Sequence, residues 1–532
     1  MKKAILYAAA AFSLMTGATS CSDFGDVNND PEQMTPSILD FKLVFTQVMS
    51  QACGSDWDVW RNGMIYSASM LQHTTSVDWD YGTFYAYSDG YNAAYWDGYY
   101  SGDRAAIRNV YLVMQEWKER PEYQNEYQMC RIIRAFMFHR MTDLYGDVPY
   151  FDASKGIEGV GYPKYDTQQA IYNDLFKELD EAQAALSTSA ATTVKNEDLV
   201  YGGDVTKWKK FANSLMLRLA MRLTKVDPGT AETWVKKAIA NGLFESAADN
   251  AMVKHSDGLV TDDSAEPYGK VLSHEDPQAF YLSEFFINML KNSNDPRLPL
   301  IATVCTTPSE KWQGDFDFGD NDPSKQVGLP IGYDVKGEKW DLSNAPGYPG
   351  TNWRSYYSLP NRQTYARPDA PTMLLTYTEN LLLLAEAAYR GWISGSAKDY
   401  YEAGVRSAMQ QFSFYSAAES SYNRYLNAEA IDKYLADNPF DQSKALEQIN
   451  TQYYITTFCD EYETFANWRR SGYPVLTPVN KGYSTCVTNG TSPRRFQYPV
   501  TESQNNEANY QEAISRMNGG DKMTSRVWWD KE

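Results

Sequence analysis

Cysteine is scarce in this chain, with six residues in 532. No two of them have the C-x-x-C spacing of a zinc ribbon or a thioredoxin-type redox centre, so neither chemistry is expected. Cys21 is expected to carry a lipid. The five other cysteines are an odd number and cannot all form disulfides with one another: Cys53, Cys130, Cys305, Cys459 and Cys486. One long-range disulfide and buried free thiols are both open in an oxidising compartment.

Catalytic signatures are also missing. The chain has no H-E-x-x-H, no G-x-S-x-G, no Walker A loop and no G-x-G-x-x-G fingerprint. Its four histidines show no metal-ligand spacing: His73, His139, His255 and His274. The sequence thus has no recognisable catalytic or cofactor-binding motif, and no cofactor is expected. Carboxylates are numerous enough to leave a glycosidase pair open, but no particular pair stands out.

No apolar run beyond the first residues is long enough for a transmembrane helix. The first residues have the layout of a secretory signal: two lysines, a short apolar stretch and small residues that lead to Cys21. A bacterial lipoprotein signal has leucine three residues before the cysteine, where this chain has Ala18, and an ordinary signal peptidase site near Ser20 is the alternative. We predict a signal peptide over residues 1–20, a lipid on Cys21, a flexible leash over 21–36 and a single domain over 37–532.

Positive charge is in deficit, and the formal net charge at pH 7 is −19. Such an acidic surface argues against nucleic acid and anionic lipid as partners. Aromatic residues, in contrast, make up 14% of the chain, with 40 Tyr and 14 Trp. Because Tyr and Trp combine an apolar face with a polar edge, this excess predicts an amphipathic ligand.

Apolar residues recur at helical spacing along most of the chain, and the helices that they predict form consecutive pairs. In one pair, Trp208, Phe211 and Leu215 recur at helical spacing, Asp227-Pro228-Gly229 ends the helix, and Thr230 is expected to cap its partner. Four such hairpins are predicted: 123–145 with 167–186, 208–223 with 230–241, 371–390 with 396–412, and 443–457 with 459–471. Repeated hairpins of amphipathic helices resemble a degenerate tetratricopeptide arrangement, and an irregular helical domain is the alternative.

Two segments depart from this pattern and supply the candidate ligand site. Residues 301–359 lose the helical period and form a loop-rich insertion, and 57–100 are crowded with Trp and Tyr. Aromatic planes that alternate with Asp and Asn suit a sugar, which has a C–H face and a rim of hydroxyls. We therefore nominate seven ligand-binding residues: Trp79, Tyr81, Asn92 and Trp96 on one wall, and Trp312, Trp353 and Tyr356 on the other. The alternative is that these side chains pack internally under the loops.

A cluster of acidic residues in the insertion is a weak candidate for structural calcium. Hard oxygen ligands at short spacing favour this ion, and the chain has Asp315, Asp317, Asp320 and Asp322 in one glycine-containing loop. The spacing departs from an EF-hand, because the terminal glutamate is not in place. A solvated acidic loop is the preferred interpretation.

Several segments together resemble the SusD/RagB family, in particular its SusD-like second subfamily. They are RAFMFHRMTDLYGDVPY at 134–150, ENLLLLAEAAYRG at 379–391, ANWRRSGYP at 466–474, PRRFQYP at 493–499 and DKMTSRVWWD at 521–530. Within them, Arg469 and Arg470 are expected to form structural ion pairs with Glu461 and Glu463. The two tryptophans near residue 528 are expected to anchor the C-terminal segment.

The resemblance implies a mainly α-helical fold: a right-handed bundle of four tetratricopeptide-like helix pairs, with the loop-rich, aromatic-rich remainder packed on one side. It also implies a lipoprotein on the cell-surface side of the outer membrane, attached through Cys21. Family members capture oligosaccharides or oligopeptides without catalysis and act as the lid of a SusC-like TonB-dependent transporter. Two other functions stay open on the residues alone: a surface glycan hydrolase with a carboxylate pair, and a helical-repeat scaffold that binds a partner protein.

Overall fold

The computed structural model describes residues 39–102, 104–256, 264–306, 318–479 and 482–532. The predicted signal peptide, Cys21, the leash, Trp312, Asp315 and Asp317 lie outside these ranges. Residues Val44–Glu532 form one compact unit, and Met1–Leu43 are assigned to another. No helix of the described ranges has the length and apolarity that crossing a bilayer requires.

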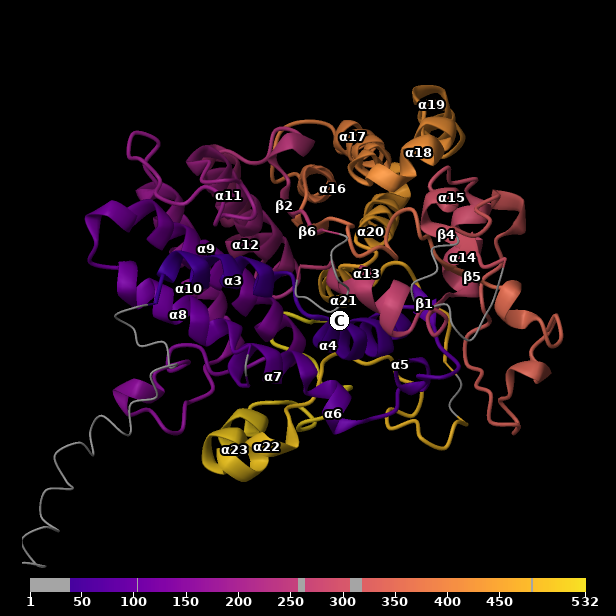
Figure 1. The fold of residues 1–532 in the computed structure, drawn as a ribbon, viewed down its shortest axis with the longest axis horizontal. Helices are drawn as coiled ribbons and strands as arrows, with labels where there is room; N and C mark the ends of the chain where they lie inside the picture. Colours follow the sequence, from indigo (N-terminus) through magenta and orange to yellow (C-terminus); the bar gives the residue numbers. More distant parts are fainter. Residues whose placement is uncertain (1–38, 103, 257–263, 307–317, 480–481) are drawn as a thin grey trace, which may run out of the picture. The chain divides into compact units, whose positions relative to one another are not determined.

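All four predicted helix pairs are present in the unit Val44–Glu532 (Figure 1). Each helix packs on its partner, and neighbouring pairs pack on one another through α10 with α11, α11 with α16 and α9 with α21. The pairs are α9 (Gln124–Tyr145) with α10 (Gln168–Ala185), α11 (Val205–Arg222) with α12 (Pro228–Asn241), α16 (Tyr377–Tyr389) with α17 (Ala397–Gln410), and α20 (Ala445–Thr456) with α21 (Glu461–Ser471). The predicted fold class is confirmed.

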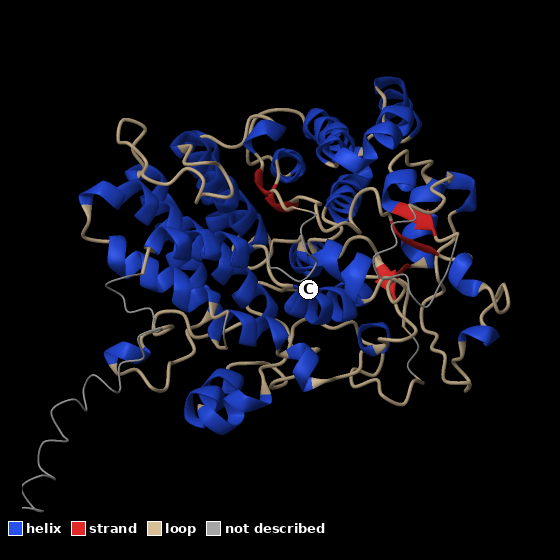
Figure 2. Cartoon of the chain, in the orientation of Figure 1, coloured by secondary structure: helices blue, strands red, loops and turns tan. Residues whose placement is uncertain are grey.

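Most of the remaining helices of the described ranges are short, and they precede, separate or follow the pairs along the chain (Figures 1 and 2). Before α9 come α3 (Phe41–Ala52), α4 (Asp56–Asp58), the π-helix η1 (Val59–Ala68), α5 (Tyr81–Phe84), α6 (Asp89–Asn92), α7 (Ala94–Tyr100) and α8 (Ala106–Trp117). After α12 come α13 (Pro267–Lys270), the π-helix η5 (Val271–Glu275), α14 (Glu284–Asn292), α15 (Leu298–Ile301), the 3-10 helix η8 (Trp353–Ser355), α18 (Glu419–Tyr425), α19 (Ala428–Asp437), α22 (Val500–Asn505) and α23 (Glu507–Ser515).

Side-chain caps fix where the long helices begin. The predicted cap of α10 is confirmed, because the Thr167 side chain accepts a hydrogen bond from the Ala170 amide. The predicted cap of α12 is wrong. Asp227 caps this helix by accepting from the Thr230 amide, and Pro228 occupies the first turn, where its missing N–H costs nothing.

Helix α16 begins with a capping box, in which Thr376 and Glu379 satisfy each other's backbone N–H groups. We expect Thr376→Ala to lower the free energy of unfolding by about 1 kcal/mol, since one buried amide loses its acceptor. Urea denaturation measures this change. Thr233→Ala on the exposed face of α12 is the matched control, with an expected loss below about 0.5 kcal/mol. Equal losses in the two variants would contradict the cap.

The six strands of the described ranges are short, pair two by two and tie the loops to the helices. The antiparallel pairs are β1 (Thr74–Thr75) with β3 (Tyr281–Leu282), β2 (Ala251–Val253) with β6 (Thr372–Leu375), and β4 (Ala302–Val304) with β5 (Ser358–Pro360). Strands β3 and β5 also contact each other. The strands therefore gather the residues around 75, 281 and 358, which are far apart in the sequence.

The predicted insertion is loop-rich in its described part but has a hydrophobic core of its own. This core joins the insertion to β1 and β3, and its buried members are Val77, Tyr281, Cys305, Leu329, Leu342, Ala345, Tyr357 and Leu359. The partly buried side chain of Trp353 packs against this core. The core gives the loops between β4 and β5 a fixed position on the helical body.

A buried ionic network lies where the helix pairs meet. Arg222 of α11 donates to Glu463 of α21 at 2.6 Å, and Arg218 donates to Glu379 of α16 at 2.5 Å. Burial would raise the pKa of Glu463, but Arg222 and Arg218 outweigh it and lower the pKa to about 2. Arg222 also lies 3.3 Å from Asp143 of α9. The network therefore connects all four helix pairs, and it includes no residue of the candidate ligand site.

The ion pairs expected around residue 470 are structural, but their partners differ from the prediction. Arg470 binds Glu386 with two hydrogen bonds of 2.7 and 2.8 Å, and Glu461 lies against His73. Arg469 donates to two backbone carbonyls. Spacing along α21 could not reveal the side-chain partners, because Glu386 lies on α16 and His73 lies just before β1.

The C-terminal segment is anchored as predicted. Trp529 is fully buried, and its indole Nε1 donates to Asp143 Oδ1 of α9 at 2.8 Å. None of the five cysteines in the described ranges is in a disulfide, and Cys53, Cys130 and Cys305 are buried. The sequence left a disulfide and buried thiols open, and in the described ranges these cysteines are thiols.

Candidate functional site

Four aromatic side chains from separate segments meet at the surface of the unit Val44–Glu532. Tyr91 lies among them, with its ring centroid 6.0 Å from Trp79, 6.4 Å from Trp60 and 5.2 Å from Tyr81. Trp60 and Trp79 meet edge to face at 5.2 Å. All four rings are partly exposed, so they support one another and still face solvent. We call these four residues the Trp79 cluster.

Two π-helices and one strand pair bring the Trp79 cluster together. The π-helix η1 carries Trp60, and π-helical turns are rare and frequent at functional sites. Because β1 pairs antiparallel with β3, the loop after β1 runs beside the residues that join η5 to β3. In consequence, the Trp79 indole Nε1 donates to Asp276 Oδ2 at 3.0 Å. The indole plane is thereby held in one orientation.

An exposed tryptophan and a buried arginine extend the Trp79 cluster. Trp57 of α4 is 54% exposed, and the Arg61 guanidinium carbon lies 3.1 Å from the centroid of its ring. The same carbon lies 4.5 Å from the Trp60 ring and 5.6 Å from the Tyr91 ring. Arg61 itself is 7% exposed, and burial lowers the pKa of its guanidinium. The cation therefore fixes the Trp57 plane beside the cluster.

Two carboxylates border the Trp79 cluster, and both are bound by protein groups. Burial raises the pKa of Asp276 to about 6, against the hydrogen bond from Trp79, and the neighbouring Asp78 adds to the rise. Asp78 Oδ2 lies 3.4 Å from Arg354 Nη2 of the insertion. The site thus offers carboxylate oxygens for the hydroxyls of a ligand and aromatic faces for its apolar surface.

The ion pair between Asp78 and Arg354 connects the cluster to aromatic residues of the insertion. The Arg354 guanidinium lies 4.3 Å from the ring of Trp353, whose centroid is 5.4 Å from that of Tyr281. Tyr356 is 42% exposed and packs edge to face on Tyr357. We call Trp353, Tyr356 and Tyr357 the insertion patch. Of the nominated residues, Trp79 and Tyr81 belong to the Trp79 cluster and Trp353 and Tyr356 to the insertion patch, and the ion pair between Asp78 and Arg354 links the two groups.

Asn92 and Trp96 do not belong to this surface, contrary to the sequence prediction. Asn92 is 1% exposed, and its side-chain amide exchanges hydrogen bonds with the Gln497 backbone at 2.6 and 3.0 Å. Trp96 is 4% exposed and packs among tyrosines that include Tyr145 and Tyr498. Both side chains tie α6 and α7 to the C-terminal segment, so they are unavailable to a ligand.

The residues that the nomination missed are Trp57, Trp60, Arg61 and Tyr91. Three of them are part of the aromatic run that the sequence singled out, but the choice among so many rings could not be made by composition. Arg61 carried no signal, because its surroundings depend on the π-helical turn that places it between two indoles.

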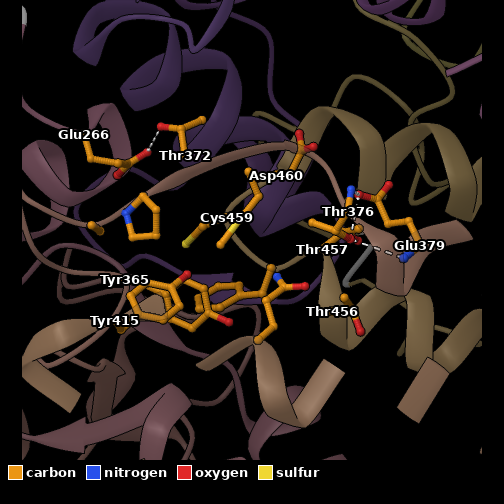
Figure 3. Close-up of a pocket in the computed structure, with 15 residues that line it drawn as sticks. Glu266, Tyr365, Thr372, Thr376, Glu379, Tyr415, Thr456, Thr457, Cys459 and Asp460 are labelled. Carbon is orange, nitrogen blue, oxygen red and sulfur yellow. Dashed lines mark hydrogen bonds between the residues drawn. The ribbon is translucent and has the colours of Figure 1, made fainter. Parts of the chain in front are cut away.

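A separate interior cavity lies between β6, α16 and the end of α20 (Figure 3). Its volume is about 40 Å³, and its polar lining includes Glu266, Glu379, Thr456 and Asp460. Pockets for small organic ligands have volumes of about 300–1,000 Å³, so this cavity is suited to a few water molecules and not to a sugar ring. This cavity is therefore too small to be the binding site for a sugar.

The carboxyl of Glu266 in this cavity is an uncompensated acid. It accepts hydrogen bonds from the Gly269 amide at 2.5 Å and from Thr372 Oγ1 at 3.0 Å, and burial raises its pKa to about 7. A raised pKa means that the neutral form stabilises the fold. That stability is fully present below the ordinary pKa of 4.5 and is lost as the pH rises through about 7.

Glu266→Gln, which imitates the neutral acid, is therefore expected to be more stable than the natural chain at pH 8. The expected gain is on the order of 2–3 kcal/mol in the free energy of unfolding, and it should vanish near pH 4.5. Urea midpoints at the two pH values measure it. Glu447→Gln, on the exposed face of α20, controls for the substitution itself. A gain that is equal at both pH values would contradict the neutral buried carboxyl.

Two larger hollows open at the surface. One, of about 640 Å³, lies on α14 beside the insertion and is lined by Phe285, Asn288, Met289 and Tyr333, among others. The other, of about 540 Å³, lies at the start of α10 and is lined by Gln169, Arg516 and Trp528, among others. The first adjoins the insertion, whereas the second lies against the C-terminal segment.

The described part of the acidic loop shows no cation site. Asp320 pairs with Lys325, and Asp322 Oδ1 accepts hydrogen bonds from Ser324. Within the described ranges, no group of three or more His, Cys, Asp or Glu side chains is placed to hold a metal ion. The calcium suggestion also involved Asp315 and Asp317, which lie outside those ranges.

The fold and the surface together define a class: a helical-repeat body with a partly exposed aromatic surface on its connecting segments. Residues 29–499 match the model of the SusD-like family described as starch-binding and associating with the outer membrane. This chain belongs to that SusD-like family. The comparison with curated proteins finds no significant match.

Solved structures similar to this chain are SusD homologues and chitin-binding proteins. A chitin-binding protein is 33% identical with a TM-score of 0.77, and the match covers 92% of this chain and 100% of the other. A Bacteroidetes SusD-like protein is 27% identical with a TM-score of 0.79, over 93% and 100% of the two chains. A chitin-binding SusD homologue from Flavobacterium johnsoniae is 25% identical with a TM-score of 0.70, over 92% and 99%.

Proposed function

We propose that this protein captures glycans at the cell surface without catalysis and delivers them to a TonB-dependent outer-membrane transporter. The observation that carries the proposal is the Trp79 cluster: several mutually supported, partly exposed rings bordered by carboxylates. A sugar places its C–H face on such a ring and its hydroxyls on the polar border. Because an open surface desolvates one face of the ligand, binding is moderate and release is easy, as delivery requires.

Membership of an outer-membrane-associated family supports the location and the partner. In this proposal the lipid on Cys21 holds the chain at the surface, and the chain acts as a lid over a SusC-like barrel. The lid closes when ligand binding favours the closed state by a few kcal/mol. Metabolic labelling with palmitate should label the natural chain and leave Cys21→Ser unlabelled.

Binding and partnership are tested separately. The purified chain is titrated with panels of oligosaccharides and of peptide mixtures, and binding is followed through tryptophan fluorescence. We expect saturable binding of a glycan. Binding of peptides alone would overturn the glycan assignment while leaving the transport role in place. Affinity purification from the native membrane should recover a transporter barrel in fixed stoichiometry, and recovery of a different protein partner on the helix pairs would favour the scaffold.

The geometry of Asp78 and Asp276 bears on the hydrolase alternative. A hydrolase needs two carboxyl groups that flank a scissile bond, whereas Asp78 pairs with Arg354 and Asp276 holds the Trp79 indole. The proposal therefore expects that a bound oligosaccharide stays intact during prolonged incubation. New reducing ends that disappear in Asp276→Asn would establish the hydrolase instead.

A further inference from the structure

Arg61 is a buried cation that has no carboxylate partner in the described part of the chain. Asp56, the carboxylate that acts on Arg61 electrostatically, is already bound by Lys270 at 2.6 Å and faces Arg104 at 3.6 Å. Instead, Arg61 lies between the rings of Trp57 and Trp60. Cations that are nearly buried without compensation are uncommon, since desolvation of the charge costs free energy.

Most hydrogen-bond donors of Arg61 are unused. A guanidinium has five N–H groups, and in Arg61 the Nη1 group donates a hydrogen bond to the Trp57 carbonyl at 3.3 Å. The Nε and Nη2 atoms of Arg61 form no hydrogen bond within the described residues, and both keep some contact with solvent. The guanidinium therefore presents free donors at the edge of the aromatic surface, beside the exposed ring of Trp57.

These donors define the chemistry of the group they would bind. Arginine donates and never accepts, so the ligand must supply an acceptor. The net charge of −19 opposes a polyanionic glycan, which leaves uncharged substituents. Among these, an amide carbonyl is an acceptor only, whereas a hydroxyl must also place its own proton. An acetamido group adds a methyl that packs on an indole face.

We propose that Arg61 is a specificity-determining residue that donates to the carbonyl oxygen of an acetamido group on the bound glycan, whose sugar rings lie on Trp57 and Trp79. This inference rests on the proposed glycan-binding function and narrows it to N-acetylated sugars. The similarity to two chitin-binding proteins is in keeping with it, since every sugar of chitin carries this group.

Three β-1,4-linked hexasaccharides that differ only at carbon 2 test the proposal. Chitohexaose has the acetamido group, cellohexaose has a hydroxyl, and glucosamine hexaose has an amine. The natural chain should bind chitohexaose about tenfold more tightly than cellohexaose, because a hydrogen bond from a charged donor is lost in the second case. Glucosamine hexaose lacks the carbonyl and its ammonium faces the guanidinium, so it should bind more weakly than chitohexaose even though the net charge of −19 attracts it. Isothermal titration calorimetry measures all three.

In Arg61→Gln the preference should disappear. Affinity for chitohexaose should fall about tenfold, cellohexaose should change less than about twofold, and glucosamine hexaose should bind more tightly than to the natural chain. Equal losses for chitohexaose and cellohexaose would show that Arg61 only positions Trp57 and would overturn the proposal. Trp57→Phe, which keeps a ring above Arg61, should weaken both ligands alike and keep the preference.

Failure of this inference is distinguishable from failure of the proposed function. Binding of a glycan without N-acetyl groups, in preference to chitohexaose, would overturn the role of Arg61 and leave glycan capture standing. Binding of an acidic oligosaccharide that is lost in Arg61→Gln would assign Arg61 to a carboxylate instead. Absence of binding to every glycan tested would overturn both.

Discussion

Replacing Trp79 with alanine is expected to weaken glycan binding roughly 100-fold while the chain stays folded. The variant loses one aromatic face for the sugar and also the ring edge that supports Trp60 and Tyr91. Loss of a ring contact together with loosening of its neighbours amounts to about 2–3 kcal/mol. Isothermal titration calorimetry gives the affinity, and circular dichroism shows that the fold is intact.

Two matched variants separate the ring from its surroundings. Trp79→Phe keeps an aromatic face but loses the N–H that donates to Asp276, so a loss of about tenfold is expected. Tyr162→Ala removes an exposed ring that lies outside the Trp79 cluster and should leave affinity unchanged. Unchanged affinity in Trp79→Ala would place the ligand elsewhere, and the hollow on α14 would be the next site to test through Asn288→Ala.

Glu463→Ala should destabilise the chain by about 3–5 kcal/mol. The substitution leaves Arg222 without its ion pair to Glu463, and it removes one acceptor of the Tyr453 hydroxyl, all inside the packed core. Arg222 then keeps only the longer contact to Asp143 at 3.3 Å, and a buried charge that loses its main partner is costly because water cannot reach it. Thermal and urea unfolding measure the loss, which corresponds to a large part of the stability of an ordinary domain.

Glu463→Gln preserves shape and hydrogen bonding, so it isolates the charge and should cost less than the alanine variant. Asp437→Ala breaks an exposed ion pair with Lys433 on α19 and should cost below about 0.5 kcal/mol. Losses of similar size at Glu463 and Asp437 would argue that the buried network contributes little.

The helix pairs were predictable because their signals are local. Apolar residues at helical spacing and a cap such as Thr167 are read from neighbouring positions. The observed bounds lie within three residues of the prediction except at the start of 371–390, where Thr372–Leu375 form β6 and α16 begins at Tyr377. The strands were not predictable, since β1 and β3 have two residues each and exist through pairing over two hundred positions. Segments this short carry no periodic pattern of their own.

The candidate site was predictable in composition but not in detail. Trp79 and Trp96 lie in the same aromatic run with similar neighbours in sequence, yet one is partly exposed and the other is buried. What separates them is tertiary: Trp96 meets Tyr498 of the C-terminal segment, whereas Trp79 meets the loop before β3. The role of Arg61 depends on a π-helical turn, for which the sequence has no signature.

The two-residue pairing of β1 with β3 has an evolutionary consequence. It joins the loops that carry Trp79 and Asp276 through backbone hydrogen bonds, which any amino acid except proline can make. Mutations in these loops can therefore exchange aromatic and polar groups while the helix pairs remain untouched. After gene duplication, copies of such a chain can acquire different ligand specificities through a few substitutions that do not disturb folding.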